Sequence, residues 1–458
     1  MSPLSSQGLS RSVEGNESSL SSIDRSQVKC FDKVRAGSSV HGLWNEIELR
    51  PLSREQQIWK AVLLIFCDPL PEQCRQLMHL SRREWQSLFR WLDISGMALY
   101  FLDRTAELNF EVPSFVEERL RQNLSDNTQR TRGMIAESVA IQQEFQKVSL
   151  SYATLKGFSL PPDSVPRPEL RHQFDLDFLV AEESASEARR TLERRGYRLT
   201  GMSGRSLEFK INETPNVSLD DLYTDTPGRS VELHLEASGG THSSVLDRIE
   251  IRDFYGIKMP VLSPVDLFIG QGLHVYKDVC SEFSRTAHLL EFRRHVSARY
   301  DDDTFWSGLR AVAEVNVRAS LGLGVVTELI TQVMGEFAPV ALTNWTTGRL
   351  SPSVRLWIDM YGRRAVFKKF PGNKLYLLLQ EELESAGIPV KRSLRKALVP
   401  SRLPPLVVKK SAGESLSTRM LRYWVQVTFI FFRLRFHLVE GVRYTWERYR
   451  WRQHLNRL

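Results

Sequence analysis

Apolar residues recur at helical spacing through the first third of the chain and then give way to short alternating runs. From about Pro51 to Val148, apolar positions three and four residues apart predict an antiparallel set of helices. Short apolar runs between turn signals follow: TLKGFSL, FDLDFLV, SLEFKI and SVELHLEA. Such runs are typical of strands. A helix-like segment from Glu182 to Arg195 separates the second run from the third. The order predicts an α+β fold with a small mixed sheet.

Helical spacing returns at Ser263, where Ser263 and Pro264 give a helix start signal, and continues to about Ser385. Prolines then interrupt the chain, and the last 44 residues predict one helix rich in arginine and aromatic residues. We therefore expect a serine-rich disordered tail (1–48), an N-terminal helical region (49–150), a sheet-containing core (151–262), a C-terminal helical region (263–388), and a basic linker with an amphipathic helix (389–458).

Composition places the chain among globular proteins, because 42% of its residues are hydrophobic and 25% are charged. These values exclude a mainly disordered chain, a collagen-like repeat and a small disulfide-stapled scaffold. The cysteines, Cys30, Cys67, Cys74 and Cys280, form no CxxC pair and show no zinc-ligand spacing. The N-terminus lacks a signal-peptide core, and the apolar run Tyr423–Phe432 is too short to span a bilayer. We expect reduced thiols and a cytoplasmic protein.

The net charge of +8 is unevenly distributed along the chain. Residues 391–458 hold 16 Lys/Arg against 3 Glu, a net charge of +13, whereas the preceding 390 residues carry −5. The body is therefore mildly acidic, and a nucleic-acid-binding role does not follow from the overall charge. A basic amphipathic helix over 415–458 is compatible with an anionic membrane surface, RNA or an acidic partner, or with docking on the body through its apolar residues. A peripheral position at a membrane is left open.

Two carboxylates carry the most specific chemical signal. Asp175 and Asp177 alternate with Leu176 and Phe178, so on a strand both acids lie on one face and the apolar residues face the core. Two carboxylates on one wall repel each other unless a cation lies between them. Mg²⁺ bridging a triphosphate is a common solution. Because of the repulsion, we expect removal of either acid to leave stability equal or higher.

Neighbouring segments supply further candidates. Lys156 and Gly157 follow a predicted strand, where the glycine could admit a phosphate and the lysine could neutralise it. Arg171 could also hold a phosphate, although a surface arginine after a proline-rich loop is an equal alternative.

The strand Ser230–Glu236 places Glu232, His234 and Glu236 on one face and could supply a third acid. Glu208 lies in a similar apolar-acid-apolar segment and is the rival for that role. For His234, a structural hydrogen bond is the simpler interpretation.

Together these residues resemble the nucleotidyltransferases of the DNA polymerase beta superfold, and more closely a bacterial branch of uncharacterised nucleotidyltransferase-like proteins. The similarity rests on Leu155-Lys156-Gly157, on Arg171 four residues before the Asp175–Val180 strand, and on Val231-Glu232-Leu233-His234. A helical segment with His274 and Lys277 follows. The resemblance implies a small mixed sheet flanked by helical regions.

The resemblance also implies an activity. It implies transfer of a nucleoside monophosphate from an NTP to an acceptor that the sequence does not identify, with two Mg²⁺ ions on Asp175, Asp177 and Glu232. Lys156, Gly157, Arg171 and His234 would contact the nucleotide. The alternative is a catalytically weak nucleotide-binding or scaffold protein that docks a partner or membrane through its basic tail. Phe174, where the relatives tend to have a small residue, favours that alternative.

Overall fold

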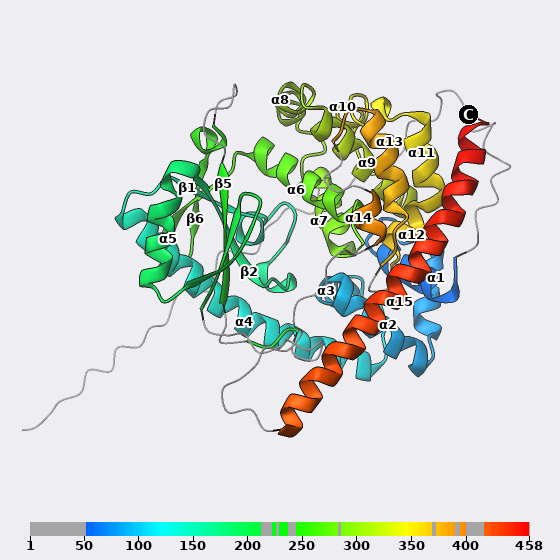
Figure 1. Cartoon of the computed structure of the whole chain (residues 1–458), viewed down its shortest axis with the longest axis horizontal. Helices are drawn as coiled ribbons and strands as arrows, with labels where there is room; N and C mark the ends of the chain where they lie inside the picture. Colours follow the sequence, from blue (N-terminus) through cyan, green and yellow to red (C-terminus); the bar gives the residue numbers. More distant parts are fainter. Residues whose placement is uncertain are drawn as a thin grey trace, which may run out of the picture. The chain divides into compact units, whose positions relative to one another are not determined.

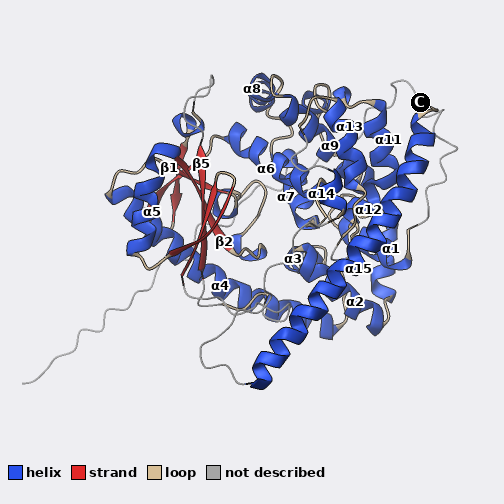
Figure 2. Cartoon of the chain, viewed as in Figure 1, coloured by secondary structure: helices blue, strands red, loops and turns tan. Residues whose placement is uncertain are grey.

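A seven-stranded mixed sheet organises the described part of the chain, with helices before and after it in sequence (Figures 1 and 2). The computed structural model describes residues 52–211, 222–225, 229–236, 244–282, 285–368, 372–389, 394–399 and 416–457. The predicted disordered tail, 1–48, lies outside these residues. The predicted α+β fold with helical regions on both sides of a mixed sheet is confirmed.

Within the described ranges, four α-helices precede the sheet, and the first two begin at a serine that caps the helix. The four are α1 (Arg54–Leu64), α2 (Arg82–Ser95), α3 (Ala98–Glu107) and α4 (Ser114–Lys147). At the start of α2, the Ser81 side chain accepts a hydrogen bond from the backbone N–H of Glu84, and the Glu84 side chain accepts one from the backbone N–H of Ser81. This reciprocal pair satisfies two amides that a helix start leaves unpaired. The helix ends at Gly96, whose φ of 78° is readily adopted only by glycine.

The sheet has the strand order β3-β4-β5-β2-β1-β7-β6. The strands are β1 (Tyr152–Leu155), β2 (Asp175–Ala181), β3 (Arg198–Ser203), β4 (Ser206–Ile211), β5 (Arg229–Glu236), β6 (Glu250–Phe254) and β7 (Ile257–Val261). Strands β2 and β5 are parallel, as are β1 and β7, whereas the other neighbouring pairs are antiparallel. Strands β3, β6 and β7 were not among the predicted runs.

One face of the sheet is covered by α4 and by α5 (Ala185–Arg194). The core on this face contains Ile141 and Phe145 from α4, Leu192 from α5, and the inward side chains of β2 and β5. Phe178 of β2 is fully buried against Phe145, with ring centroids 5.5 Å apart. Because successive side chains on a strand point to opposite faces, the acids of β2 face away from this core.

The helices after the sheet are α6 (Pro264–Val279), α7 (Thr286–Ala298), α8 (Asp303–Ala313), α9 (Val317–Met334), α10 (Val340–Thr343), α11 (Pro352–Trp357), α12 (Arg363–Val366), α13 (Tyr376–Ser385), α14 (Leu394–Leu398) and α15 (Leu416–Leu455). A π-helical turn joins α11 to α12 over Ile358–Gly362. The predicted start of α6 is confirmed, since the Ser263 side chain accepts a hydrogen bond from the Asp266 amide and Pro264 is the first helical residue.

One helix, α9, is long and apolar enough to cross a membrane by length and composition. It is 72% buried within the protein, as the central helix of a packed bundle would be. The expectation that no segment spans a bilayer stays a prediction.

Helix α15 docks on the body through a face that the sequence did not indicate. Tyr444 and Trp451 are 2% and 1% exposed, whereas Trp424 and Leu438, two of the apolar residues that would pack on the body in the docking alternative, are 67% and 69% exposed. The interpretation that those apolar residues pack against the body is therefore wrong.

The described secondary structure changes from helix to strand between α4 and β1 and back to helix at α6. Residues 50–458 nevertheless form one compact unit. The proposed division of this part into separate domains stays a prediction.

Candidate functional site

The acids of β2 lie on the sheet face opposite the α4–α5 core, as the alternation of the strand predicts. Leu176 and Phe178 are buried in that core, whereas Asp175 and Asp177 line a pocket on the other face. In the parallel pairing of β2 with β5, Asp177 is level with Glu232. Residues level with each other on adjacent strands have side chains on the same face, so the register brings these two acids together.

Asp177 is the centre of a short hydrogen-bond network. Its Oδ1 accepts hydrogen bonds from the Lys156 ammonium at 2.7 Å and from His234 Nε2 at 2.8 Å. The same His234 nitrogen lies 3.4 Å from Glu232 Oε2. One histidine therefore bridges the two carboxylates, which agrees with the hydrogen-bonded role that the simpler interpretation gave it. A contact of His234 with a nucleotide stays a prediction.

Charge pairing keeps this network ionised. Burial raises the pKa of Asp177, but the His234 hydrogen bond and the Lys156 charge outweigh it, and the pKa lies below its usual value. Burial opposes the charge on His234, but hydrogen bonds to Asp177 and Glu232 raise its pKa. The His234 hydrogen bond also lowers the pKa of Glu232. Asp177 and Glu232 are thus held as carboxylates, the form that ligates a hard cation.

Asp175 is in a different electrostatic environment from Asp177, two residues away. Among the described residues, none donates a hydrogen bond to its carboxylate. Burial, followed by repulsion from Asp177, raises the pKa of Asp175 to about 6. A raised pKa means that the ionised carboxylate costs folding free energy at neutral pH.

We expect this cost to be measurable in the presence of a chelator. Because the pKa of Asp175 is higher in the folded chain (about 6) than in the unfolded chain, its contribution to stability is fully present at acid pH and is lost as pH rises through about 6. The variant Asp175→Asn lacks this titration. As pH rises from 5 to 7, wild type should lose stability relative to Asp175→Asn. The difference in free energy of unfolding should shift in favour of the variant by on the order of 1–2 kcal/mol. Urea unfolding at several pH values tests this, and a constant difference would contradict it.

Lys156 and Gly157 form a tight turn after β1 that positions the lysine over Asp177. Gly157 has a φ of 33°, and a Cβ there would lie 2.5 Å from the Oε1 atom of Gln173. Only glycine fits this turn without strain. Lys156 itself has a positive φ of 49°. The turn brings the Lys156 ammonium to the rim of the same pocket as the acids.

The pocket beside the acid pair has a volume of about 240 Å³. Its lining combines Lys156, Arg171, Gln173, Phe174, Asp175 and Asp177 with residues of α6 and α7, namely His274, Asp278, Arg285 and His288. The strand β2 thus contributes two carboxylates and α6 a third, Asp278, and the lining also carries three cationic side chains. Such a pairing suits a ligand that has both bound cations and anionic oxygens.

Arg171 is not the surface residue that the alternative interpretation assumed. Its side chain is 13% exposed, and its Nε donates a hydrogen bond to Glu291 Oε1 at 3.1 Å. The Tyr100 hydroxyl donates a hydrogen bond to the same oxygen at 2.9 Å. Arg171 is therefore fixed by a buried pair that orients it toward the pocket.

The α6–α7 wall contains residues that sequence reasoning did not assign. His288 Nδ1 lies 2.7 Å from Asp278 Oδ2, and the His274 and His288 rings are 4.9 Å apart. Burial lowers the pKa of both histidines to about 3, so both are neutral at physiological pH. Each of the three offers a ligand atom within 4.8 Å of the others, as do Asp177, Glu232 and His234. The signal in the sequence was the His274–Asp278 spacing of one helical turn.

The remaining candidates lie outside this cluster. Glu208 is level with Glu232 on β4, but its carboxylate pairs with Lys210 at 2.8 Å. Glu236 accepts hydrogen bonds from Ser244 and from backbone amides at the start of a 3₁₀ turn, so it has a structural partner. Lys277 is exposed and does not line the pocket.

Phe174 lies at the pocket edge between two guanidinium groups. The Arg130 and Arg285 guanidinium carbons lie 4.8 and 5.4 Å from its ring centroid. Such stacking is favourable for a cation over an aromatic ring. Phe174 therefore helps to hold Arg285 in position at the pocket.

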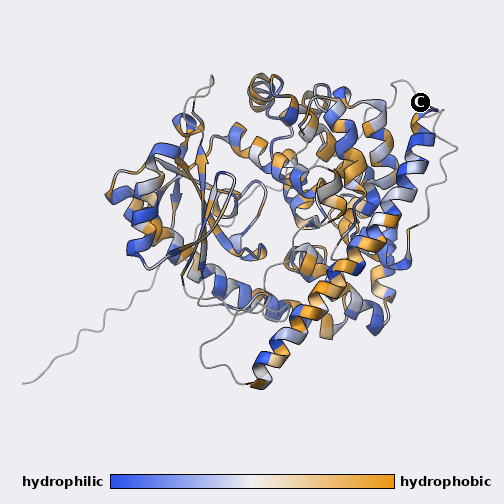
Figure 3. Ribbon diagram, viewed as in Figure 1, coloured by the Kyte–Doolittle hydropathy of each residue, from blue (hydrophilic) through white to orange (hydrophobic). Residues whose placement is uncertain are grey.

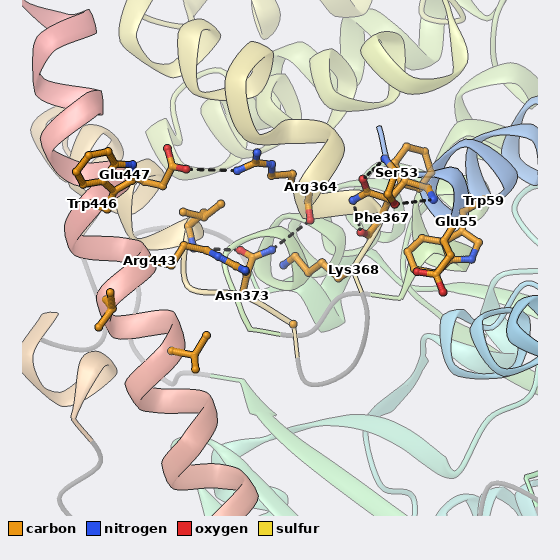
Figure 4. Close-up of a pocket in the computed structure, with 15 residues that line it drawn as sticks. Ser53, Glu55, Trp59, Arg364, Phe367, Lys368, Asn373, Arg443, Trp446 and Glu447 are labelled. Atoms are coloured by element: carbon orange, nitrogen blue, oxygen red, sulfur yellow. Dashed lines mark hydrogen bonds and ion pairs between the residues drawn. The ribbon is translucent and has the colours of Figure 1, made fainter. Parts of the chain in front are cut away.

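A larger pocket of about 620 Å³ lies elsewhere, between α1, α12 and α15 (Figure 4). Trp59, Arg364, Lys368 and Trp446 are among the residues that line it. It contains none of the candidate catalytic or nucleotide-binding residues and no cluster of metal-ligating side chains among the described residues. Volume alone does not make it the functional site, because the convergent charged groups lie beside β2.

Comparison with solved structures and with curated proteins adds little. A solved structure, an antigenic nucleotidyltransferase-like protein from Paracoccidioides brasiliensis, is 13% identical and matches with a TM-score of 0.26. The match covers 43% of this chain and 92% of that one; a likeness of this size carries no argument. No curated protein matches the chain.

A family match covers the site itself. Residues 81–330 match the family described as uncharacterised nucleotidyltransferase. The matched segment makes up more than half of the 458 residues and includes the Lys156 turn, the β2 acid pair and Glu232. The chain therefore belongs to this uncharacterised nucleotidyltransferase family.

Proposed function

We propose that this protein transfers a nucleoside monophosphate from an NTP to an acceptor hydroxyl in the pocket beside β2. The observation that carries the proposal is the placement of Asp175, Asp177 and Glu232 on one sheet face, with cationic residues in the pocket that the two aspartates line. Membership of a nucleotidyltransferase family supports the general activity. Neither the placement of these residues nor the family membership identifies the acceptor.

The residues fit a divalent cation by their donor chemistry. Carboxylate oxygens are the ligands that Mg²⁺ prefers, and Asp177 and Glu232 are both held ionised. No described residue donates a hydrogen bond to the Asp175 carboxylate, and its ionised form is destabilised. A bound cation would supply the counter-charge for it. Asp175, Asp177 and Glu232 would hold the ions. When bound, Mg²⁺ supplies a lowered pKa for the acceptor hydroxyl and charge neutralisation for the leaving pyrophosphate.

The chain's own side chains would bind and orient the triphosphate. Arg171 and Arg285 border the pocket from two different elements, and Glu291 and Phe174 hold them in position. Lys156 neutralises Asp177 in the ligand-free pocket and lies close enough to the pocket to contact a phosphate oxygen. Neutral His274 and His288 can donate or accept hydrogen bonds without adding charge.

The direct test is pyrophosphate release by purified full-length protein with each NTP, with Mg²⁺ or a chelator, and with a panel of acceptors. Release that requires Mg²⁺ supports the proposal. NTP binding without release from any acceptor would support the alternative of a catalytically weak nucleotide-binding protein. That alternative is favoured by one observation: His234 and Lys156 both occupy the same oxygen of Asp177. Absence of both binding and release contradicts both functions.

A comparison of two glutamates tests the third ligand. Glu232→Gln should reduce NTP turnover at least about tenfold, equivalent to about 1.4 kcal/mol of transition-state stabilisation, because Glu232 is level with Asp177 and shares His234 with it. Glu208→Gln is the matched control, since Glu208 is on the next strand and pairs with Lys210. Steady-state kinetics of both variants decide the assignment. The reverse ranking would transfer the role to Glu208.

A further inference from the structure

Helix α15 exposes an unusual share of the protein's apolar surface. Of the 26 large hydrophobic side chains exposed in the described residues, 14 lie on this one helix. Figure 3 shows hydrophobic and hydrophilic residues interleaved along it. Scattered single apolar residues need no explanation, but a contiguous exposed set marks an interaction surface.

The exposed residues follow helical spacing and form one line. We call Trp424, Phe431, Leu434, Leu438, Val442 and Trp446 the outward stripe; all are at least 60% exposed. Residues three, four and seven apart lie on one face of a helix. At 1.5 Å per residue the stripe is about 33 Å long.

The opposite face of α15 is anchored to the body by specific contacts. The Tyr444 hydroxyl donates a hydrogen bond to Glu381 of α13 at 2.6 Å, and Trp451 Nε1 donates one to Glu382 at 3.1 Å. Glu447 accepts a hydrogen bond from the Tyr361 hydroxyl at 3.1 Å. The helix is therefore held in one orientation. In this orientation Val442 and Trp446, at one end of the stripe, also border the pocket shared with α1 and α12, while the stripe side chains remain largely exposed.

Charge on α15 is divided between its two faces. Residues 416–457 contain nine arginines, no lysine and only two acids, Glu440 and Glu447. Both acids are buried on the inward face, at 5% and 2% exposure. Arg435, Arg443 and Arg452 are exposed. The solvent-facing side of the helix thus combines a long apolar stripe with positive charge and no described negative charge.

We propose that the outward stripe of α15 docks this protein on an anionic membrane surface, with the helix lying in the plane of the interface. Apolar side chains enter the acyl boundary while flanking arginines contact anionic headgroups. Tryptophan at positions 424 and 446 suits the headgroup level. A second copy of the chain is a poorer occupant, because two outward faces would oppose arginine to arginine.

Co-sedimentation of the full-length protein with vesicles tests the proposal. The protein should bind vesicles of phosphatidylcholine mixed with phosphatidylglycerol at low salt and should not bind phosphatidylcholine alone. High salt should weaken binding, because it screens the arginines. Failure to bind the anionic vesicles at low salt overturns the proposal.

Point variants separate the apolar and the charged contribution. The stripe variant, a triple variant, carries Trp424→Gln, Phe431→Gln and Leu438→Gln and should abolish vesicle binding. A charge variant with Arg435→Glu and Arg452→Glu should weaken binding at least about tenfold. Val315→Gln/Met202→Gln and Arg189→Glu/Arg205→Glu are matched controls, since they change equally exposed residues elsewhere and should bind as wild type does.

Two further measurements distinguish loss of membrane binding from loss of the fold and from dissociation of a dimer. The stripe variant should retain the melting temperature of wild type, because the three substituted side chains are exposed. If the stripe variant binds vesicles as wild type does, the proposal is overturned. Sedimentation velocity gives the oligomeric state. A wild-type dimer that the stripe variant dissociates would assign the stripe to a second copy and likewise overturn membrane docking.

Discussion

Asp177→Asn is expected to reduce Mg²⁺-dependent NTP turnover by about a thousandfold or more, equivalent to about 4 kcal/mol. Asp177 is the residue on which the Lys156 ammonium and His234 converge, and it is level with Glu232. Removing its charge removes a cation ligand and leaves two half-buried donors facing a neutral amide. Pyrophosphate release measured at saturating NTP, with wild type as reference, gives the size of the loss.

The same variant should also be less stable, which separates Asp177 from Asp175. From the sequence, loss of either acid was expected to leave stability equal or higher. The structure changes this expectation for Asp177, because its two charged hydrogen bonds stabilise the folded chain by about 1–3 kcal/mol. At pH 7, Asp177→Asn should therefore lower the free energy of unfolding and Asp175→Asn should raise it. Turnover at the wild-type level in either variant would contradict the assignment of the site.

Glu291→Gln is expected to cost about 3 kcal/mol of unfolding free energy and to raise the KM for NTP. Glu291 is buried at 2% exposure and accepts hydrogen bonds from Arg171 and Tyr100. Loss of its charge leaves the buried Arg171 guanidinium without a counter-ion, which is far more costly than loss of an exposed pair. Urea unfolding and NTP-dependence of the rate measure the two effects separately.

An exposed pair provides the control for this prediction. Arg167 and Asp103 are joined at 2.7 Å, but their side chains are 57% and 31% exposed, so Asp103→Asn should cost less than about 1 kcal/mol. The double variant Arg171→Met/Glu291→Leu should regain most of the stability without regaining NTP affinity. Recovery of both would show that Arg171 serves only the fold and does not bind nucleotide.

The sequence by itself determined the local part of the site. Alternation along β2 predicted that Asp175 and Asp177 share a face and that Leu176 and Phe178 enter the core, because side-chain direction on a strand follows from its period of two. The capping residues before α6 likewise predicted its start, since they satisfy helix amides within a few residues. Both are properties of a short segment and need no knowledge of its neighbours.

Only the tertiary structure decided which distant residues meet. Glu232 and Glu208 have similar sequence contexts, and the parallel register of β2 with β5 places Glu232, not Glu208, level with Asp177. The two pocket histidines come from α6 and α7, whose placement beside the acids has no local signal. His288 of α7 contacts Asp278 of α6 at the pocket, a contact between two helices that neither segment indicates by itself.

Helix α15 shows the same division most clearly. Its helical spacing and its arginines were evident in the sequence, so the helix and its basic character could be predicted. The docked face could not, because the count of apolar residues points to the stripe around Leu438, whereas the body binds the face with Tyr444 and Trp451. Amphipathic spacing tells which residues share a face. Hydrogen-bond partners such as Glu381 and Glu382, contributed by another helix, determine which face is buried.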